Sequence, residues 1–197
     1  MNPAPDRDRN RRLALAVLAT LLFHTVVKAR LGTLPELLWG CNVASFLIAA
    51  GLWLGEARLV GPAFLWHLAV GEPAYVWGAL QAGHTGWTSI LAHSVPTVCA
   101  FLFLRRRGLP RSAPYLALLL FVALVPLSFA FTPPALNVNM AHQRLDVLQA
   151  RFPGLWSYRA VFSAGMLALL LVGDALASRV LGRPSPPAGS GESVPGS

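Results

Sequence analysis

The apolar residues of the chain are gathered into long runs that contain few charges and are separated by short polar stretches. A helix that crosses a bilayer needs about 20 consecutive, mostly apolar residues, and these runs approach or reach that length. The pattern predicts an all-α fold, a polytopic transmembrane helical bundle with six spans. The predicted spans cover residues 13–31, 34–55, 59–80, 86–104, 113–131 and 158–180.

The segments outside the spans are short. Residues 1–12 form a basic stretch before the six-helix transmembrane domain, which covers residues 13–181. Residues 182–197 are rich in Pro, Gly and Ser, a composition typical of disorder, and we expect a disordered cytoplasmic tail there. Apolar residues recur at helical spacing over residues 141–152. This stretch is predicted to be either a simple connector or an amphipathic helix in the membrane interface, lying over an outward-facing pocket.

Composition supports a membrane location. Only 12% of the residues are charged and the mean hydropathy is +0.55, whereas soluble domains carry about 25% charged residues. We therefore expect one integral domain in the cell membrane. Both cysteines, Cys41 and Cys99, fall inside apolar runs, so no disulfide framework is predicted. A charge inside a span needs a partner, and Asp174 is predicted to pair with Arg179.

The net charge of +8 comes from arginines at the ends of the apolar runs. With a cytoplasmic N-terminus, 11 of the 16 Lys and Arg residues fall on the cytoplasmic side, which agrees with the positive-inside rule. Both termini are therefore predicted to be cytoplasmic. No nucleic-acid-binding motif accompanies the charge. The expected partners are membrane lipids rather than nucleic acid, and no feature of the sequence specifies an oligomer.

Four reactive or ionisable residues occupy a similar depth in four predicted spans. Cys41, His93, His24 and Glu72 each lie about seven or eight residues from the outer end of their span, which corresponds to roughly 10 Å at 1.5 Å per residue. A cysteine thiolate beside a histidine base is the arrangement used in acyl transfer, and a carboxylate can orient the histidine. The predicted catalytic set is Cys41, His93 and Glu72.

Other polar residues surround this layer and are candidates for binding a lipid or small hydrophobic substrate. They are Glu36, Asn42, His24, Asn137 and Asn139. No Cys/His spacing typical of a metal site occurs in the sequence, and no metal or other cofactor is expected. Haem ligation by His24, His67 and His93 is an alternative that no spacing demands.

A non-catalytic function is the alternative to acyl transfer. In "VGEPAYVWG", Pro73 directly follows Glu72 and interrupts backbone hydrogen bonding in the third span. Discontinuous helices aimed at an ionisable residue are typical of transporters. The alternative is therefore a membrane module for small-solute binding, or a transporter subunit, centred on Glu72 with His67 as its partner.

Four segments resemble the YwaF-like family of bacterial integral membrane proteins. They are "LPELLWGCNVASFLIAAGLWLG", "FLWHLAVGEPAYVWGAL", "SILAHSVPTVCAFLFL" and "NVNMAHQRLDVLQARFPGLWSYRAVFSAGMLALLLVGDAL". The family has a Leu-Cys pair in its second span, a Trp-rich third span, a His in its fourth and an Asn-rich segment before its last. Cys41 and His93 stand at the positions of that cysteine and histidine, although "WGC" replaces the Leu-Cys pair here.

The resemblance implies an enzyme. The YwaF-like family is distantly similar to eukaryotic six-span proteins that act on lipid acyl chains, among them a cysteine-dependent phospholipid acyltransferase and fatty-ester hydrolases that use Thr and His. Carried over to this chain, the resemblance implies an intramembrane lipid acyltransferase or hydrolase near the outer leaflet. Cys41 would be its nucleophile and His93 its base.

Overall fold

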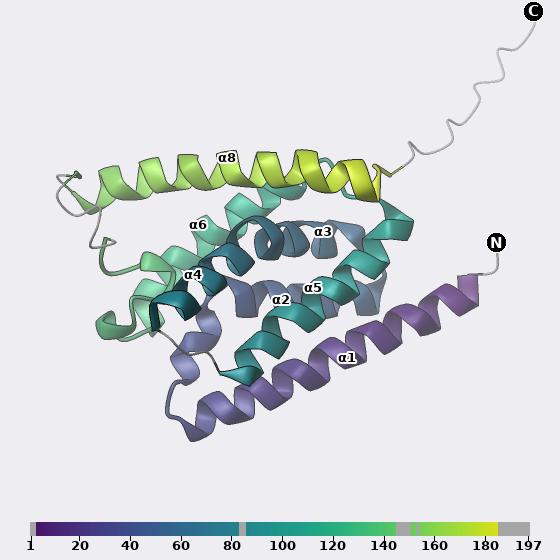
Figure 1. Cartoon of the computed structure of the whole chain (residues 1–197), viewed down its shortest axis with the longest axis horizontal. Coiled ribbons are helices and arrows are strands. Elements are labelled where there is room, and N and C mark those ends of the chain that lie inside the picture. The colour runs from purple at the N-terminus through teal and green to yellow at the C-terminus, as the bar shows by residue number, and fades with distance from the viewer. Residues whose placement is uncertain (1–2, 83–85, 145–150, 153, 185–197) are drawn as a thin grey trace, which may run out of the picture.

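A computed structural model of the chain describes residues 3–82, 86–144, 151–152 and 154–184, and these residues form a bundle of helices (Figure 1). No strand occurs within these ranges, which confirms the predicted all-α class. The predicted amphipathic helix falls largely on residues 145–150, outside the described residues, and residues 141–144 of that stretch are not helical. Most of the predicted disordered tail also lies outside the described residues.

Four of the helices, α1 (over Asp6–Arg30), α5, α6 and α8, are long and apolar enough to cross a membrane, and α2 is a shorter apolar helix. These helices fit an integral membrane protein. In chain order the elements are α1 (Pro3–Arg30), a 3-10 turn (Leu34–Leu38), α2 (Gly40–Leu54), α3 (Ala57–Trp66), a π-helical turn (His67–Gly71), α4 (Glu72–Ala82), α5 (Trp87–Arg107), α6 (Ala113–Phe131), two short 3-10 turns (Pro134–Leu136 and Val138–Met140) and α8 (Leu155–Leu181). The longest stretch between two successive α-helices of the described structure runs from the end of α6 at Phe131 to the start of α8 at Leu155.

The first helix begins earlier than the hydropathy pattern predicts. α1 starts at Pro3 and includes the basic stretch that the sequence suggested as a separate flank. An ion pair supports this extension, because Asp6 Oδ1 lies 2.8 Å from Arg106 Nη1 at the end of α5. The predicted second span is also divided, since a 3-10 turn and Trp39, with a ψ of 136°, precede α2. Pro35 lies in that turn and favours a break in the helix.

One end of the bundle gathers both ends of the described chain and the connection between α5 and α6 (Figure 1). The Leu109 N–H donates a hydrogen bond to the Gly182 carbonyl at 3.0 Å. Arg183 also donates to the Leu109 carbonyl at 3.3 Å. This end therefore joins the termini of three helices through specific backbone contacts.

Asp174 pairs with Arg183 and not with the predicted Arg179. The Arg183 guanidinium donates to both carboxylate oxygens of Asp174, at 2.8 and 2.6 Å. α8 ends at Leu181, and Gly182, with a φ of +71°, turns the chain so that Arg183 reaches back to the carboxylate. Hydrogen bonding to Asp174 raises the pKa of Arg183 above its ordinary value, so the arginine stays charged.

The other end of the bundle is tied together by Asn139. This residue has a φ of +51°, a left-handed conformation that Asn tolerates better than most residues. Its Oδ1 accepts a hydrogen bond from the Gly40 N–H at 2.9 Å. Its Nδ2 donates to the Leu38 carbonyl at 2.7 Å and to Ser128 Oγ at 2.8 Å. The loop after α6 is thereby fixed to the start of α2.

The core is formed where α2 and α3 pack against α5, α6 and α8, with α1 on the outside of α2 and α5 (Figure 1). Small residues allow the close approach. A Cβ atom at Gly40 would lie 2.5 Å from the Trp66 ring, and one at Gly51 would lie 2.7 Å from Val60. Close backbone approach at small residues is the usual packing mode of helices in membranes. This packing also sets α2 against the π-helical turn, where the polar residues gather.

Candidate functional site

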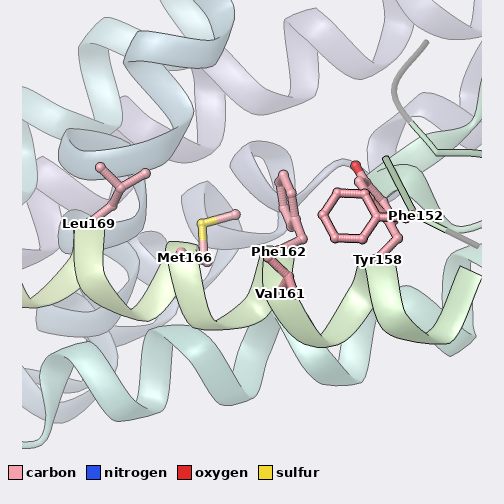
Figure 2. Close-up of a pocket in the computed structure, with 7 residues that line it drawn as sticks. Phe152, Tyr158, Val161, Phe162, Met166 and Leu169 are labelled. Carbon is pink, nitrogen blue, oxygen red and sulfur yellow. The ribbon is translucent and has the colours of Figure 1, made fainter. Parts of the chain in front are cut away.

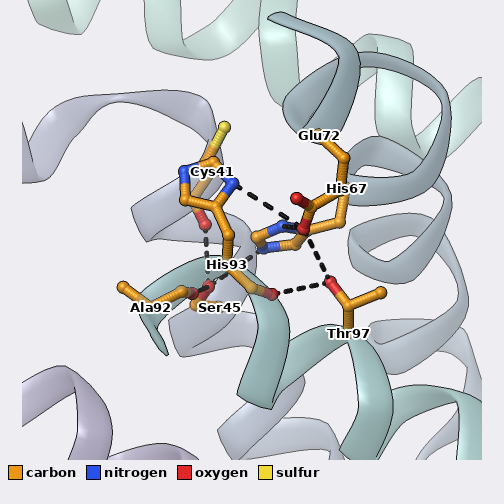
Figure 3. Close-up of polar contacts among 7 residues, drawn as sticks. All are labelled: Cys41, Ser45, His67, Glu72, Ala92, His93 and Thr97. Carbon is orange, nitrogen blue, oxygen red and sulfur yellow. Dashed lines mark hydrogen bonds and ion pairs between the residues drawn. The ribbon is translucent and has the colours of Figure 1, made fainter. Parts of the chain in front are cut away.

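Glu72 lies between two histidines from different parts of the chain (Figure 3). Its Oε1 is 3.6 Å from His67 Nδ1 and 3.7 Å from His93 Nδ1. One ligand atom from each residue can be chosen so that all three lie within 4.8 Å of one another. The side chain of His67 is fully buried, while those of His93 and Glu72 are 12% and 30% exposed. We refer to His67, Glu72 and His93 as the Glu72 cluster.

The π-helical turn places two members of the cluster on one side of the helix. The Glu72 N–H donates to the His67 carbonyl, a bond that closes a turn of five residues. In a regular α-helix, residues five positions apart point about 140° away from each other. In the wider π turn, side chains five positions apart lie on nearly the same side of the helix. Pro73 explains the turn, because a proline has no N–H and its ring clashes with the carbonyl of the preceding α-helical turn.

Cys41 lies beside the π-helical turn but outside the cluster. A Cβ atom at Gly71 would be 2.9 Å from the Cys41 sulfur, so the glycine makes room for the half-buried thiol. Among the described residues no hydrogen bond joins this thiol to His93, whose Nδ1 faces Glu72 instead. The structure thus brings Cys41, Glu72 and His93 into one region, with His93 Nδ1 facing the Glu72 carboxylate.

Ser45 contacts the second ring nitrogen of His67. Its Oγ lies 2.9 Å from the Cys41 carbonyl and 2.9 Å from His67 Nε2. A hydroxyl has one proton. When that proton goes to the carbonyl, Oγ accepts a hydrogen bond from His67 Nε2–H. In a neutral His67 the Nδ1 is then a bare acceptor, and it faces the acceptor oxygen of Glu72.

Two acceptors that face each other with no donor between them are unfavourable. Within the described part of the chain, neither His67 Nδ1 nor His93 Nδ1 has a hydrogen-bond partner. Both nitrogens are directed at the same carboxylate oxygen (Figure 3). A proton on one of the two nitrogens, or a cation between the three side chains, satisfies these atoms.

Two side chains that the sequence analysis did not identify hold the cluster in place. The ring of Tyr75 stacks on His93 with 4.3 Å between the ring centroids. The hydroxyl of Thr97 lies 3.2 Å from Glu72 Oε1 and 2.8 Å from the His93 carbonyl. Thr97 and His93 are one helical turn apart, as are Ser45 and Cys41, so helical spacing from the predicted residues was the available signal.

The remaining predicted residues near α1 lie outside the cluster. His24 Nδ1 is 3.3 Å from Thr88 Oγ1. Glu36 forms an ion pair with Lys28, and Asn42 Nδ2 donates to the Glu36 carbonyl at 3.0 Å. These contacts join α1 to α5 and to the 3-10 turn, and the 3-10 turn to the start of α2. A substrate-binding role for these residues stays a prediction.

Asn137 and Asn139 lie in the loop after α6. Asn137 Oδ1 accepts hydrogen bonds from the backbone N–H groups of His142 and Gln143, at 3.0 and 2.9 Å. Asn139 connects this loop to α2 through the three bonds described above. Their polar groups are thus engaged in holding the loop, and a role in substrate binding stays a prediction.

Comparison of the chain with protein families, with curated proteins and with solved structures gave no match. The resemblance to the YwaF-like family therefore stays a prediction. Function has to be argued from the Glu72 cluster and its surroundings.

Proposed function

We propose that the chain crosses the membrane six times, with both termini in the cytoplasm. α3, the π-helical turn and α4 follow one another without a break over residues 57–82, which is more than the roughly 20 residues that a span needs. α2 and the preceding 3-10 turn would form the shortest crossing. The end of the bundle with Arg106 and Arg183 would face the cytoplasm, because cytoplasmic segments are enriched in Lys and Arg.

We further propose that the protein is a non-catalytic membrane module that binds a small cationic solute at the Glu72 cluster, either alone or as a subunit of a transporter. One observation carries the proposal: Glu72 Oε1 faces the Nδ1 atoms of His67 and His93, and neither nitrogen has a hydrogen-bond partner among the described residues. A carboxylate within a membrane domain is costly and usually marks a substrate or ion pathway.

The π-helical turn within the third segment supports this function. The turn departs from regular α-helical hydrogen bonding directly beside an ionisable residue. Single π turns in helices also occur frequently at functional sites. Here the π turn supplies His67 and immediately precedes Glu72, so the irregular turn and the binding residues coincide.

A panel of cations tests the proposed function. The purified protein is heated in lipid nanodiscs with Na⁺, K⁺, ammonium, tetramethylammonium, Mg²⁺ or Zn²⁺, and the unfolding temperature is measured. At least one cation is expected to stabilise the wild type, by about 2.7 kcal/mol at 100 times its Kd. Glu72→Gln is expected to lose the effect, because it removes the only negative charge of the cluster.

Glu56→Gln is the matched control, because Glu56 is an exposed carboxylate at the far end of α3. This variant should respond to cations as the wild type does. Stabilisation by neutral or anionic solutes alone would contradict the proposal. An equal response of Glu72→Gln and the wild type to every cation would also contradict it.

A lipid acyltransferase or hydrolase with Cys41 as nucleophile is the second candidate. Cys41 lies against Gly71, next to Glu72 in the chain. An apolar cavity of about 390 Å³ along α8, lined by Phe152, Tyr158 and Phe162 among others, is suited to an acyl chain (Figure 2). This function is also what the YwaF-like resemblance implies.

A thiol-reactive lipid electrophile distinguishes the two candidates. Acyl transfer predicts strong labelling of Cys41, weaker labelling after His93→Ala, and labelling that is unchanged by Cys99→Ala. Cation binding predicts that His93→Ala leaves the labelling of Cys41 unchanged, because no hydrogen bond joins the two side chains within the described structure.

A further inference from the structure

We propose that the Glu72 cluster binds a divalent transition-metal ion of the zinc class, with His67 Nδ1, His93 Nδ1 and Glu72 Oε1 as its three protein ligands. This inference rests on the proposed function, since it names the chemical class of the cation at the same site. It also revises the expectation from sequence that the chain has no metal site.

The separations between the ligand atoms fit such an ion. Zinc binds histidine nitrogen and carboxylate oxygen at about 2.0–2.2 Å in tetrahedral sites, which places neighbouring ligand atoms about 3.3 Å apart. Here Glu72 Oε1 is 3.6 Å and 3.7 Å from the two nitrogens, and the three ligand atoms lie within 4.8 Å of one another. Small movements of the side chains would close the site around one ion.

The types of ligand select the class of metal. Two imidazole nitrogens and one carboxylate oxygen suit zinc, cobalt and related transition metals. Mg²⁺ and Ca²⁺ prefer sites made of oxygen ligands. Three protein ligands also leave a fourth position open, as in exchangeable and catalytic zinc sites rather than in closed structural ones. An open position suits a module that takes up and releases its ion.

The surroundings of the ligands are those of a metal site. A metal-binding histidine usually donates its second N–H to a fixed acceptor, which sets the tautomer and the ring orientation. When Nδ1 binds a metal ion, His67 Nε2–H has such an acceptor in Ser45 Oγ at 2.9 Å, and Ser45 is itself bonded to the Cys41 carbonyl. His93 is fixed by the Tyr75 ring, and Thr97 contacts the Glu72 carboxylate.

A bound proton fits the geometry less well than a metal ion. A proton on either Nδ1 would form a hydrogen bond from that nitrogen alone to Glu72 Oε1, and the other Nδ1 would stay without a partner. A metal ion contacts all three atoms at once. The haem alternative is not supported either, because His24 lies outside the cluster and the other two histidines share Glu72.

Titration with Co²⁺ tests this inference, because four-coordinate Co²⁺ has strong visible absorption bands and replaces zinc in such sites. The metal-free full-length protein in detergent is expected to bind one Co²⁺ per chain and to release it on addition of Zn²⁺. His67→Gln and His93→Gln should each weaken binding at least about 100-fold, because a ligand is lost. His142→Gln, which changes a histidine bonded to the Thr132 carbonyl, should bind Co²⁺ like the wild type.

Ser45→Ala provides a test that keeps all three ligands in place. Loss of the bond to His67 Nε2 is expected to weaken Co²⁺ binding about 10–100-fold. Absence of Co²⁺ and Zn²⁺ binding in the wild type, or unchanged binding in both histidine variants, would overturn the inference. If Na⁺ or an organic cation then still stabilises the protein through Glu72, the metal assignment fails alone. If no cation does so, the proposed function fails with it.

Discussion

Arg183→Ala is expected to lower the free energy of unfolding by about 3 kcal/mol. Asp174 is only 8% exposed, and removal of its partner leaves an uncompensated carboxylate in an apolar region, which typically costs about 3–5 kcal/mol. We expect the lower end of that range because the Arg183 side chain is 31% exposed. The variant also loses the bond from Arg183 to the Leu109 carbonyl. Chemical unfolding in mixed micelles measures the difference.

Arg179→Ala is the matched control for Arg183→Ala. It removes the same charge from an exposed position near the end of α8, and the described structure contains no ion pair of Arg179 with an acidic residue. Its effect on the free energy of unfolding is expected to stay within about 0.5 kcal/mol. Equal destabilisation by the two substitutions would show that the pairing of Asp174 with Arg183 does not matter for stability.

Asn139→Ala is expected to lower the free energy of unfolding by about 2–4 kcal/mol. It leaves the Gly40 N–H, the Leu38 carbonyl and the Ser128 hydroxyl without their partner, and each unsatisfied buried polar group costs about 1–3 kcal/mol. Water near the end of the bundle can compensate part of this loss. The alanine must also adopt a left-handed conformation, which adds about 1 kcal/mol.

Asn42→Ala serves as the comparison for Asn139→Ala, because Asn42 is equally buried but donates a single bond, to the Glu36 carbonyl. Its cost is expected to be about 1 kcal/mol. Both variants, where folded, should bind cations as the wild type does, because their side chains lie outside the Glu72 cluster. Weakened cation binding in folded Asn139→Ala would assign that residue a binding role instead.

The long apolar helices could be predicted from sequence because they are continuous. The predicted spans at 86–104, 113–131 and 158–180 correspond to α5, α6 and α8, whose bounds differ from them by a few residues. The hydropathy pattern did not predict the start of α1, because the first turns of this helix are formed by a basic segment. It also missed Arg183 as the partner of Asp174, since helical spacing does not describe a chain that turns back at Gly182.

The site could be predicted only in part. Glu72 and His93 were identified by their similar depth, but depth gives no information about the rotation of a helix. His67 was predicted as the partner of Glu72 only in the non-catalytic alternative, because residues five positions apart in a regular helix point about 140° away from each other. Such spacing becomes useful for binding only when a π turn intervenes. The signal for that turn was the proline directly after Glu72, together with the histidine that lies five residues before Glu72.

A double-mutant cycle between Glu72→Gln and His93→Gln tests the central claim most directly, because it measures whether the two residues belong to one site. The free energy of unfolding is measured for the metal-free wild type, both single variants and the double variant. The Glu72 cluster predicts a coupling energy of at least about 0.5 kcal/mol, as for residues in one polar network. A parallel cycle with His142→Gln should be additive. Additivity in both cycles would contradict a shared site at Glu72.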